Sequence, residues 1–385
     1  MIKAVVGGKV ITMTGRTYDP GIVLFQDGII LAVGDQLEIP DGAEVFRADG
    51  KVVMPGLIDA HCHVGITEEI YQEEGDDLNE FSDPITPHLR AIDAINPEDL
   101  AFADAIRGGV TTVGTGPGSG NVIGGESLVM KTWGSSVDAM VLRQPAGLKV
   151  ALGENPKRCY GQKQKAPMTR MATAGLLRQN LVAAQNYGQK LVCLAKKVDE
   201  VPERDLKMEA VLRALQRQIP VKVHAHRADD ILTALRIGDE FNLRITIEHG
   251  TEAHKLVEEL LKRGIPVVAG PSLINRAKVE LKDKTFKTPG ILAKAGIKVA
   301  LMTDHPVIPI EYLSLCAALA VKEGMAEDDA LLAITRNPAE ILGVDDRVGS
   351  LDPGKDADIL VLSSSILDIR TRVEMVFING NLIWS

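Results

Sequence analysis

The chain has 385 residues, a length that favours one large α/β domain with an accessory piece, or two domains. Apolar residues make up 45% and charged residues 25% of the sequence, which is typical of a globular protein and excludes a disordered one. The formal net charge of -9 argues against nucleic acid or an anionic membrane as the main partner, because both attract basic surfaces.

The cysteine pattern and the hydropathy of the sequence indicate the cellular compartment. The four cysteines form no Cys-x-x-Cys pair and no spacing typical of a disulfide framework. The sequence starts directly with a strand pattern, and no apolar run reaches the roughly 18 residues of a membrane span. We therefore expect a cytoplasmic homo-oligomer that acts on a small molecule and binds neither nucleic acid nor membrane.

Both ends of the sequence have the pattern of short strands and turns that is typical of a small antiparallel sheet. Short apolar runs in residues 1–54 are split by turn signals, among them Asp27-Gly28, and residues 346–385 show the same pattern around Asn379-Gly380. Such pairs between apolar runs indicate hairpins. The pattern predicts one small, discontinuous β-sandwich domain made from both termini, residues 1–54 plus 346–385.

Between these ends, residues 55–345 alternate between strand and helix patterns. Eight strands are expected, at residues 57–64, 110–113, 127–131, 147–152, 221–226, 244–249, 265–269 and 297–302. Eight β/α units in this length predict a (β/α)8 TIM barrel. The rival, a doubly wound open sheet, lacks a glycine fingerprint after its first strand.

Candidate metal ligands gather where these strands end. His61 and His63 share one face at the end of the first strand, because side chains alternate along a strand. Further candidates follow on later strands, namely Lys149 in the fourth, His224 and His226 ending the fifth, His249 ending the sixth and Asp304 after the eighth. Barrels keep their chemistry at the carboxyl ends of the strands, so this placement favours a catalytic metal site over ordinary core histidines.

Three motifs resemble the amidohydrolase superfamily. They are Pro55-Gly-Leu-Ile-Asp-Ala-His-Cys-His63, Ile247-Glu-His-Gly-Thr251 and Met302-Thr-Asp-His-Pro306, and the closing Gly354-Lys-Asp-Ala-Asp-Ile-Leu-Val-Leu362 also fits. The resemblance covers nearly the whole chain and lies nearest to the imidazolonepropionase-like, dipeptidase and hydantoinase branches. It implies a barrel enzyme with one or two divalent metal ions, usually zinc, that hydrolyses carbon–nitrogen bonds.

The resemblance also implies a role for each candidate. His61 and His63 match the first-strand ligand pair, and His249 matches the sixth-strand ligand. Asp304 matches the aspartate that binds metal and accepts the proton of the attacking water. The fifth-strand ligand corresponds to His224 in preference to His226, although both could line the site.

The number of metal ions depends on the fourth strand. A lysine inside an apolar strand needs a physical explanation, because burying an unpaired ammonium is costly. The resemblance implies that Lys149 is carboxylated and bridges two ions. Glu154, just after this strand, is the competing ligand for a single ion, and a Lys149 that contacts a carboxylate is the plain alternative.

At one position that matters for the reaction, the sequence differs from the pattern of the superfamily that it resembles. Deaminases of the superfamily, and imidazolonepropionase itself, carry a glutamate three residues after the fifth-strand ligand, and this chain has Arg227 there. The sequence therefore favours a metal-dependent hydrolase of an amide or another carbon–nitrogen bond, in a non-peptide or dipeptide substrate. A deaminase of a heterocyclic ring is the alternative, and a non-catalytic barrel scaffold is a third reading.

Basic residues suggest an anionic substrate. Lys157 and Arg158 follow the fourth strand, on the side where barrel loops form active sites, and Arg227 follows the fifth. We expect one of them to bind a substrate carboxylate or phosphate, with a solvated charge run as the alternative. His88, after the first strand, is a further candidate for the pocket wall.

Overall fold

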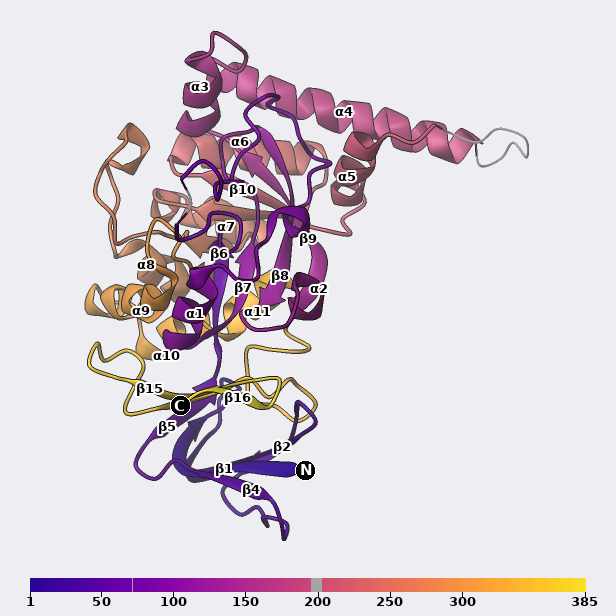
Figure 1. Cartoon of the computed structure of the whole chain (residues 1–385). Coiled ribbons are helices and arrows are strands. Elements are labelled where there is room, and N and C mark those ends of the chain that lie inside the picture. The colour runs from indigo at the N-terminus through magenta and orange to yellow at the C-terminus, as the bar shows by residue number, and fades with distance from the viewer. Residues whose placement is uncertain (71, 195–202) are drawn as a thin grey trace.

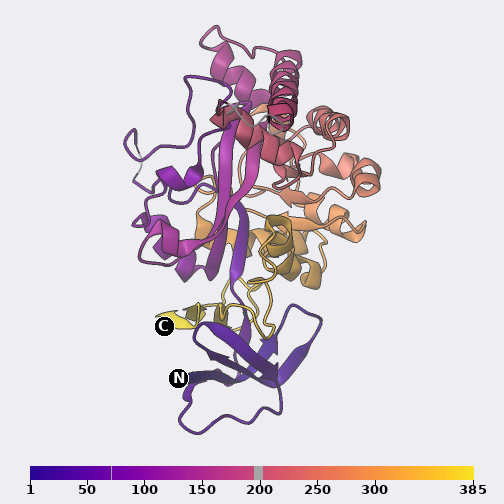
Figure 2. The same ribbon diagram turned by 90° about the vertical axis from the view of Figure 1, so that its right-hand side faces the viewer.

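The computed structural model describes residues 1–70, 72–194 and 203–385. Two β-sheets organise the chain, a barrel sheet surrounded by helices and a second sheet beyond one end of the barrel (Figures 1 and 2). None of the helices in the described ranges has the length and apolar character needed to cross a bilayer.

The barrel sheet contains the eight strands expected from the sequence. In order around the sheet they are β6 (Leu57–Cys62), β7 (Val110–Thr115), β8 (Ile123–Lys131), β9 (Val141–Ala151), β10 (Val221–Ala225), β11 (Ile245–His249), β12 (Val267–Ala269) and β13 (Val299–Leu301). Nearly every residue of the parallel strands is buried, as in a sheet whose two faces are both covered. The predicted barrel is thus confirmed as a nearly closed eight-stranded sheet in a mixed α/β fold.

One strand corrects the expectation of an all-parallel barrel. β8 runs antiparallel to both of its neighbours, β7 and β9. The connection between β7 and β8, residues 116–122, is too short for the crossover of a dozen or more residues that a parallel pair requires. The reversed β8 therefore begins, rather than ends, near the carboxyl ends of the other strands.

Asp59 joins the first and last strands of the barrel. Its Oδ1 accepts the backbone N–H of His61 at 3.0 Å, and its Oδ2 accepts the Thr303 hydroxyl at 2.6 Å and the Thr303 N–H at 3.0 Å. The backbone N–H of Asp304 also donates to the carbonyl of His61 at 3.2 Å. These bonds hold the ends of β6 and β13 side by side.

Amphipathic helices cover the outside of the barrel. They are α1 (Leu100–Arg107), α2 (Val137–Met140), α3 (Glu154–Gly161), α4 (Arg170–Leu194), α5 (Leu206–Leu215), α6 (Ala228–Glu240), α7 (Val257–Arg263), α8 (Thr288–Lys294), α9 (Leu313–Lys322), α10 (Glu327–Ala333) and α11 (Arg336–Leu342), with short 3-10 turns η1 (Ala91–Ala94), η2 (Ala253–Lys255), η3 (Val279–Leu281) and η4 (Ile310–Tyr312). In α6, Ile231, Ala234 and Leu235 recur at helical spacing and are buried. α4 extends sideways from the barrel (Figure 1).

The second sheet unites both ends of the chain, as expected. It contains β1 (Ile2–Ile11), β2 (Thr17–Gln26), β3 (Ile29–Gly34), β4 (Glu44–Arg47), β5 (Val52–Pro55), β14 (Ile359–Leu362), β15 (Val373–Ile378) and β16 (Asn381–Trp384). β5 pairs antiparallel with β14, which connects the two ends in one sheet. The domain boundaries and the description as a sandwich stay predictions.

Turn residues explain two hairpins of this sheet. Asp27 and Gly28 have positive φ angles of 51° and 85°, and Asn379 and Gly380 have 49° and 70°. These left-handed angles are those of a two-residue hairpin turn, which asparagine, aspartate and glycine tolerate. Both hairpin predictions are confirmed.

A buried ion pair joins the two sheets. Lys131, the last residue of β8, places its Nζ 2.5 Å from Asp358 Oδ2 and 3.0 Å from Asp356 Oδ2, and all three side chains are buried. The reversed direction of β8 brings this lysine to the end of the barrel that faces the second sheet.

Candidate metal centre

His61 and His63 form the first part of the site. Both rings are buried at the end of β6. Nδ1 of His61 lies 2.8 Å from Glu248 Oε2, and Nδ1 of His63 lies 2.7 Å from the carbonyl oxygen of Gly116. Because metal-binding histidines usually donate their second ring N–H to a carboxylate or a carbonyl, these contacts turn both Nε2 atoms towards Asp304, where an ion can bind.

Asp304 lies against these two Nε2 atoms. Its Oδ1 is 3.5 Å from Nε2 of His61 and 3.3 Å from Nε2 of His63. Asp304 has a positive φ of 53°, a conformation that aspartate tolerates better than most residues. Burial alone would raise the pKa of Asp304, but His249, His61 and His63 outweigh it and hold the pKa well below its usual range. The carboxylate is therefore ionised at neutral pH.

His249 connects two groups of donor atoms. The ligand atoms of His61, His249 and Asp304 lie within 4.8 Å of one another, and so do those of His224, His226 and His249. Nδ1 of His249 contacts the carbonyl oxygen of Gly270 at 3.1 Å, which leaves Nε2 free. The structure thus brings together the predicted histidines and the aspartate, although they come from four different strands.

Lys149 lies inside this cluster. Its Nζ is 3.0 Å from Nε2 of His61, and its side chain is buried. Burial lowers the pKa of Lys149 from its ordinary value to about 8, against the opposing effect of Asp304 and Glu248. About a tenth of the amine is therefore neutral at pH 7, and the neutral form is the nucleophile that carboxylation by carbon dioxide requires.

His224 and His226 differ in which ring nitrogens are engaged. Nδ1 of His226 contacts the Thr251 hydroxyl at 2.8 Å, and its Nε2 lies 3.5 Å from the Lys278 ammonium. His224 Nε2 lies 3.9 Å from Glu280 Oε1, whereas its buried Nδ1 has no hydrogen-bond partner among the described residues. An orphaned buried nitrogen is costly unless it binds something, so His224 fits a metal ligand better than His226 does.

Burial keeps these histidines neutral. It lowers the pKa of His224 to about 4 and the pKa values of His226 and His249 well below their ordinary value. Neutral imidazole is the form that binds metals, so the cluster is ready to accept an ion without first releasing protons.

Two carboxylates of the site were not predicted from the sequence. Glu248 precedes His249 on β11, faces His61 and accepts the Thr246 hydroxyl at 2.5 Å, so it orients the His61 ring. Glu280 lies on η3, in the loop after β12, with its Oε1 3.5 Å from His226 Nε2 and 2.7 Å from Lys278 Nζ. Glu248 lies inside a predicted strand, where a buried charge could have indicated a functional residue. The sequence around Glu280 contains no comparable indication.

The other predicted residues lie around this centre. Glu154 begins α3, and its backbone N–H donates to Glu280 Oε2 at 3.1 Å; its carboxylate belongs to neither donor group found in the described residues. Arg158 is exposed on α3 and Lys157 is half-buried. Their substrate-binding role stays a prediction.

Arg227 and His88 have other surroundings. The Arg227 guanidinium makes two hydrogen bonds to Asp229, at 2.9 and 2.8 Å. His88 lines a cavity of about 320 Å³, together with Asn121 and Pro117. A role in substrate binding stays a prediction for both.

Comparison with known proteins places this site in a family. The structure matches that of an amidohydrolase from Thermotoga maritima MSB8 with a TM-score of 0.96 and 45% sequence identity, covering 99% of both chains. The sequence model of the amidohydrolase family matches residues 190–383. The chain belongs to the amidohydrolase family.

Relatives with curated names agree with this assignment. Amidohydrolase tasK of Hapsidospora irregularis is 31% identical over 94% of this amidohydrolase, which spans only 39% of the length of that relative. An imidazolonepropionase of Mesorhizobium japonicum is 25% identical over 94% of this chain and 90% of its own length. The family consists of metal-dependent hydrolytic enzymes that act on carbon–nitrogen bonds, and a cluster of histidines with one aspartate suits that chemistry.

Proposed function

We propose that this amidohydrolase hydrolyses an amide or another carbon–nitrogen bond, in a small non-peptide or dipeptide substrate, with a metal-activated water. The observation that carries the proposal is the ionised Asp304 carboxylate, which lies 3.3 to 3.5 Å from the Nε2 atoms of His61 and His63. A carboxylate in this position can both bind an ion and accept a proton from water beside it.

The residues divide into two halves of a binuclear site. His61, His63 and Asp304 would hold one divalent ion, and His224, through its orphaned Nδ1, and His249 would hold the other. Nitrogen and carboxylate donors favour zinc. When bound, the metal lowers the pKa of water to about 7 and polarises the scissile carbonyl.

Lys149 would join the two halves by carboxylation. The neutral amine nitrogen forms a bond to the carbon of carbon dioxide and releases one proton, which leaves an anionic carbamate with two oxygen donors. This change removes the cost of burying an ammonium beside His61. The alternative ligand, Glu154, would give a site with one ion.

Asp304 would carry the proton. As general base it accepts a proton from the attacking water, and as general acid it returns that proton to the leaving nitrogen. Glu248 would hold the His61 ring in place through Nδ1. Its own pKa is lowered to about 2, since Lys222 and His61 outweigh the effect of burial, so it stays an acceptor.

We also propose an anionic group in the substrate. The Lys278 ammonium lies 3.5 Å from His226 Nε2 and 3.4 Å from the Asn155 side-chain oxygen, and it pairs with Glu280 at 2.7 Å, so a cation with one acidic partner borders the histidine cluster. Lys278→Gln should raise the Michaelis constant for carboxylated substrates. The Michaelis constants of Arg158→Gln and Arg227→Gln, measured with the same substrates, test the two arginines that were predicted from the sequence. If none of the three changes that constant, the substrate is not recognised through its charge.

The decisive experiment combines metal analysis with a substrate panel. Elemental analysis of the purified chain should give close to two zinc ions per chain, and N-acyl amino acids, dipeptides and cyclic amides should yield a new amine and a new carboxylate. The second candidate, a deaminase of a heterocyclic ring, draws support from an adenine deaminase of Latilactobacillus sakei subsp. sakei, which is 25% identical over 93% of this chain. Ammonia release from aminated heterocycles without amide cleavage would favour it, and a metal-free, inactive chain would favour the scaffold reading.

A further inference from the structure

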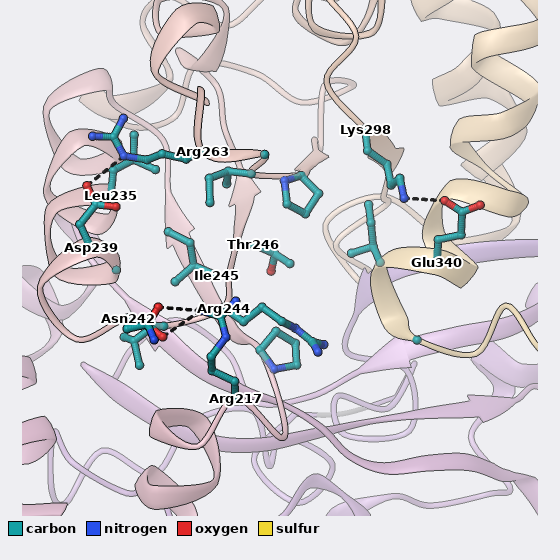
Figure 3. Close-up of a pocket in the computed structure, with 18 of the residues that line it drawn as sticks. Arg217, Leu235, Asp239, Asn242, Arg244, Ile245, Thr246, Arg263, Lys298 and Glu340 are labelled. Atoms are coloured by element: carbon teal, nitrogen blue, oxygen red, sulfur yellow. Dashed lines mark hydrogen bonds and ion pairs between the residues drawn. The ribbon is translucent and has the colours of Figure 1, made fainter. Parts of the chain in front are cut away.

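We propose that a second binding site lies at the amino-terminal end of the barrel strands and takes a small organic anion with two or more negative charges, carried by phosphate or carboxylate groups. The site is a cavity of about 730 Å³, a size within the usual range of ligand pockets. Its walls come from the residues that begin β10, β11, β12 and β13 and from the end of α11 (Figure 3).

Five cationic side chains line this cavity, and two of them are already neutralised. Arg263 pairs with Asp239 at 3.0 Å, and Lys298 pairs with Glu340 at 2.5 Å. Figure 3 shows these two pairs apart from Arg217 and Arg244, which lie close to each other. The free positive charge therefore gathers on one side of the cavity.

Three arginines carry that charge, namely Arg143, Arg217 and Arg244. Arg143 donates to the carbonyls of Leu342 and Gly343, each at 3.1 Å, and Arg217 donates to the Asn242 backbone and side-chain oxygens at 2.9 and 3.1 Å. In the described ranges none of the three forms an ion pair with a carboxylate. The guanidinium groups of Arg143 and Arg217 are thus held in place with donors to spare.

The three charges are close enough to affect one another. Partial burial lowers the pKa of Arg244, and the neighbouring charges of Arg143 and Arg217 lower it further. In a protein of net charge -9, three cations without acidic partners at one site are unfavourable unless an anion joins them. A guanidinium binds phosphate or carboxylate in bidentate fashion, which suits a ligand with several such groups.

Part of the remaining wall is apolar. Leu235, Ile245, Ile265, Pro220 and Pro266 border the cavity, so it can also hold the carbon skeleton of an organic ligand. A concave site of this kind fits a small molecule, whereas nucleic acid and acidic proteins need an extended basic surface.

The cavity is separate from the metal centre. Arg244 directly precedes β11, whose last residue is His249, so about five residues at ~3.3 Å each place the two sites about 16 Å apart along one strand. The proposal does not depend on the reaction at the metal, because binding can be measured on metal-free protein.

The test is calorimetric titration of the full chain with inorganic tripolyphosphate and, separately, with citrate, at constant ionic strength. We expect saturable binding of one anion per chain, weakened at least 10-fold in Arg244→Gln and in Arg217→Gln. Arg16→Gln removes the same charge from an exposed position in the turn between β1 and β2 and should bind like the wild type. Binding of tripolyphosphate alone identifies a phosphate site, and binding of citrate alone identifies a carboxylate site.

Several results would overturn the proposal. The first is that neither anion binds saturably at millimolar concentration. The second is that Arg16→Gln and Arg244→Gln weaken anion binding equally, since this would show a general effect of charge. Circular dichroism of each variant checks that the fold is intact. If Arg244→Gln instead changes the oligomeric state in gel filtration without changing anion binding, the arginines form a contact between copies and the ligand site is refuted.

Discussion

The buried histidines predict how the metal-free protein responds to acid. His224 has a folded-state pKa of about 4, below the ordinary value of about 6.5, because it is buried. The unfolded chain therefore binds more protons than the folded chain between these values, so stability falls as the pH falls from 6.5 towards 4. For His224 alone, the loss between pH 7 and pH 5 is about 2 kcal/mol.

The assay is urea denaturation of chelator-treated protein at pH 7 and pH 5, for the wild type and for His224→Asn. Asparagine is polar and does not titrate, so the variant should lose about 2 kcal/mol less than the wild type between the two pH values. His226 and His249, whose pKa values are lowered in the same direction, continue to act in both proteins. The comparison is independent of any change in stability that the substitution causes at pH 7.

An equal loss of stability in both proteins would refute the reasoning. It would mean that His224 reaches a charged, solvated state in the folded protein, and that the cluster is not closed to water. Zinc-loaded protein serves as a further control, because a bound ion keeps the imidazoles unprotonated and should reduce the acid effect in the wild type.

Three further predictions concern single side chains. Asp304→Asn should retain most of the metal but lower kcat by about 10²- to 10⁴-fold, which is the range of general acid–base catalysis. Near-normal turnover in this variant would show that Asp304 does not transfer the proton. Lys149→Ala should reduce bound zinc from about two ions to one per chain in elemental analysis; one ion per chain in both the wild type and the variant would point to Glu154. Lys131→Met should lower the free energy of unfolding by about 3 to 5 kcal/mol in chemical denaturation, because it leaves the carboxylate of Asp358 buried without its cation, and a loss below 1 kcal/mol would show that water reaches that site.

The positions of the barrel strands could be predicted from the sequence, but the direction of one could not be read from its own residues. A buried strand has the same apolar pattern whether it runs up or down, so residues 127–131 predicted a strand without its direction. The information lay in the length of the connection at residues 116–122. The second and third strands expected from the sequence left residues 114–126 between them, enough for a crossover, so this length became a constraint only once the structure showed where β7 ends and β8 begins.

The candidate site was predictable in part for a similar reason. His61, His224 and His249 end strands, and the carboxyl ends of parallel strands meet, so their approach follows from the fold. Glu280 comes from an irregular loop after β12, and nothing in its local sequence fixes where that loop returns. The choice between His224 and His226 also needed the structure, because it depends on which ring nitrogen lacks a partner.

The pairing of β5 with β14 has a consequence for biosynthesis. Residues 52–55 leave the ribosome long before residues 359–362, and the whole barrel is translated in between. A barrel that forms during translation does so while β5 exposes an unpaired edge and before the aspartates that pair with Lys131 have been made. Long-range pairing of this kind folds slowly and leaves the edge open to aggregation. A chaperone that shields the first 55 residues during translation would protect the stage at which this chain is most vulnerable.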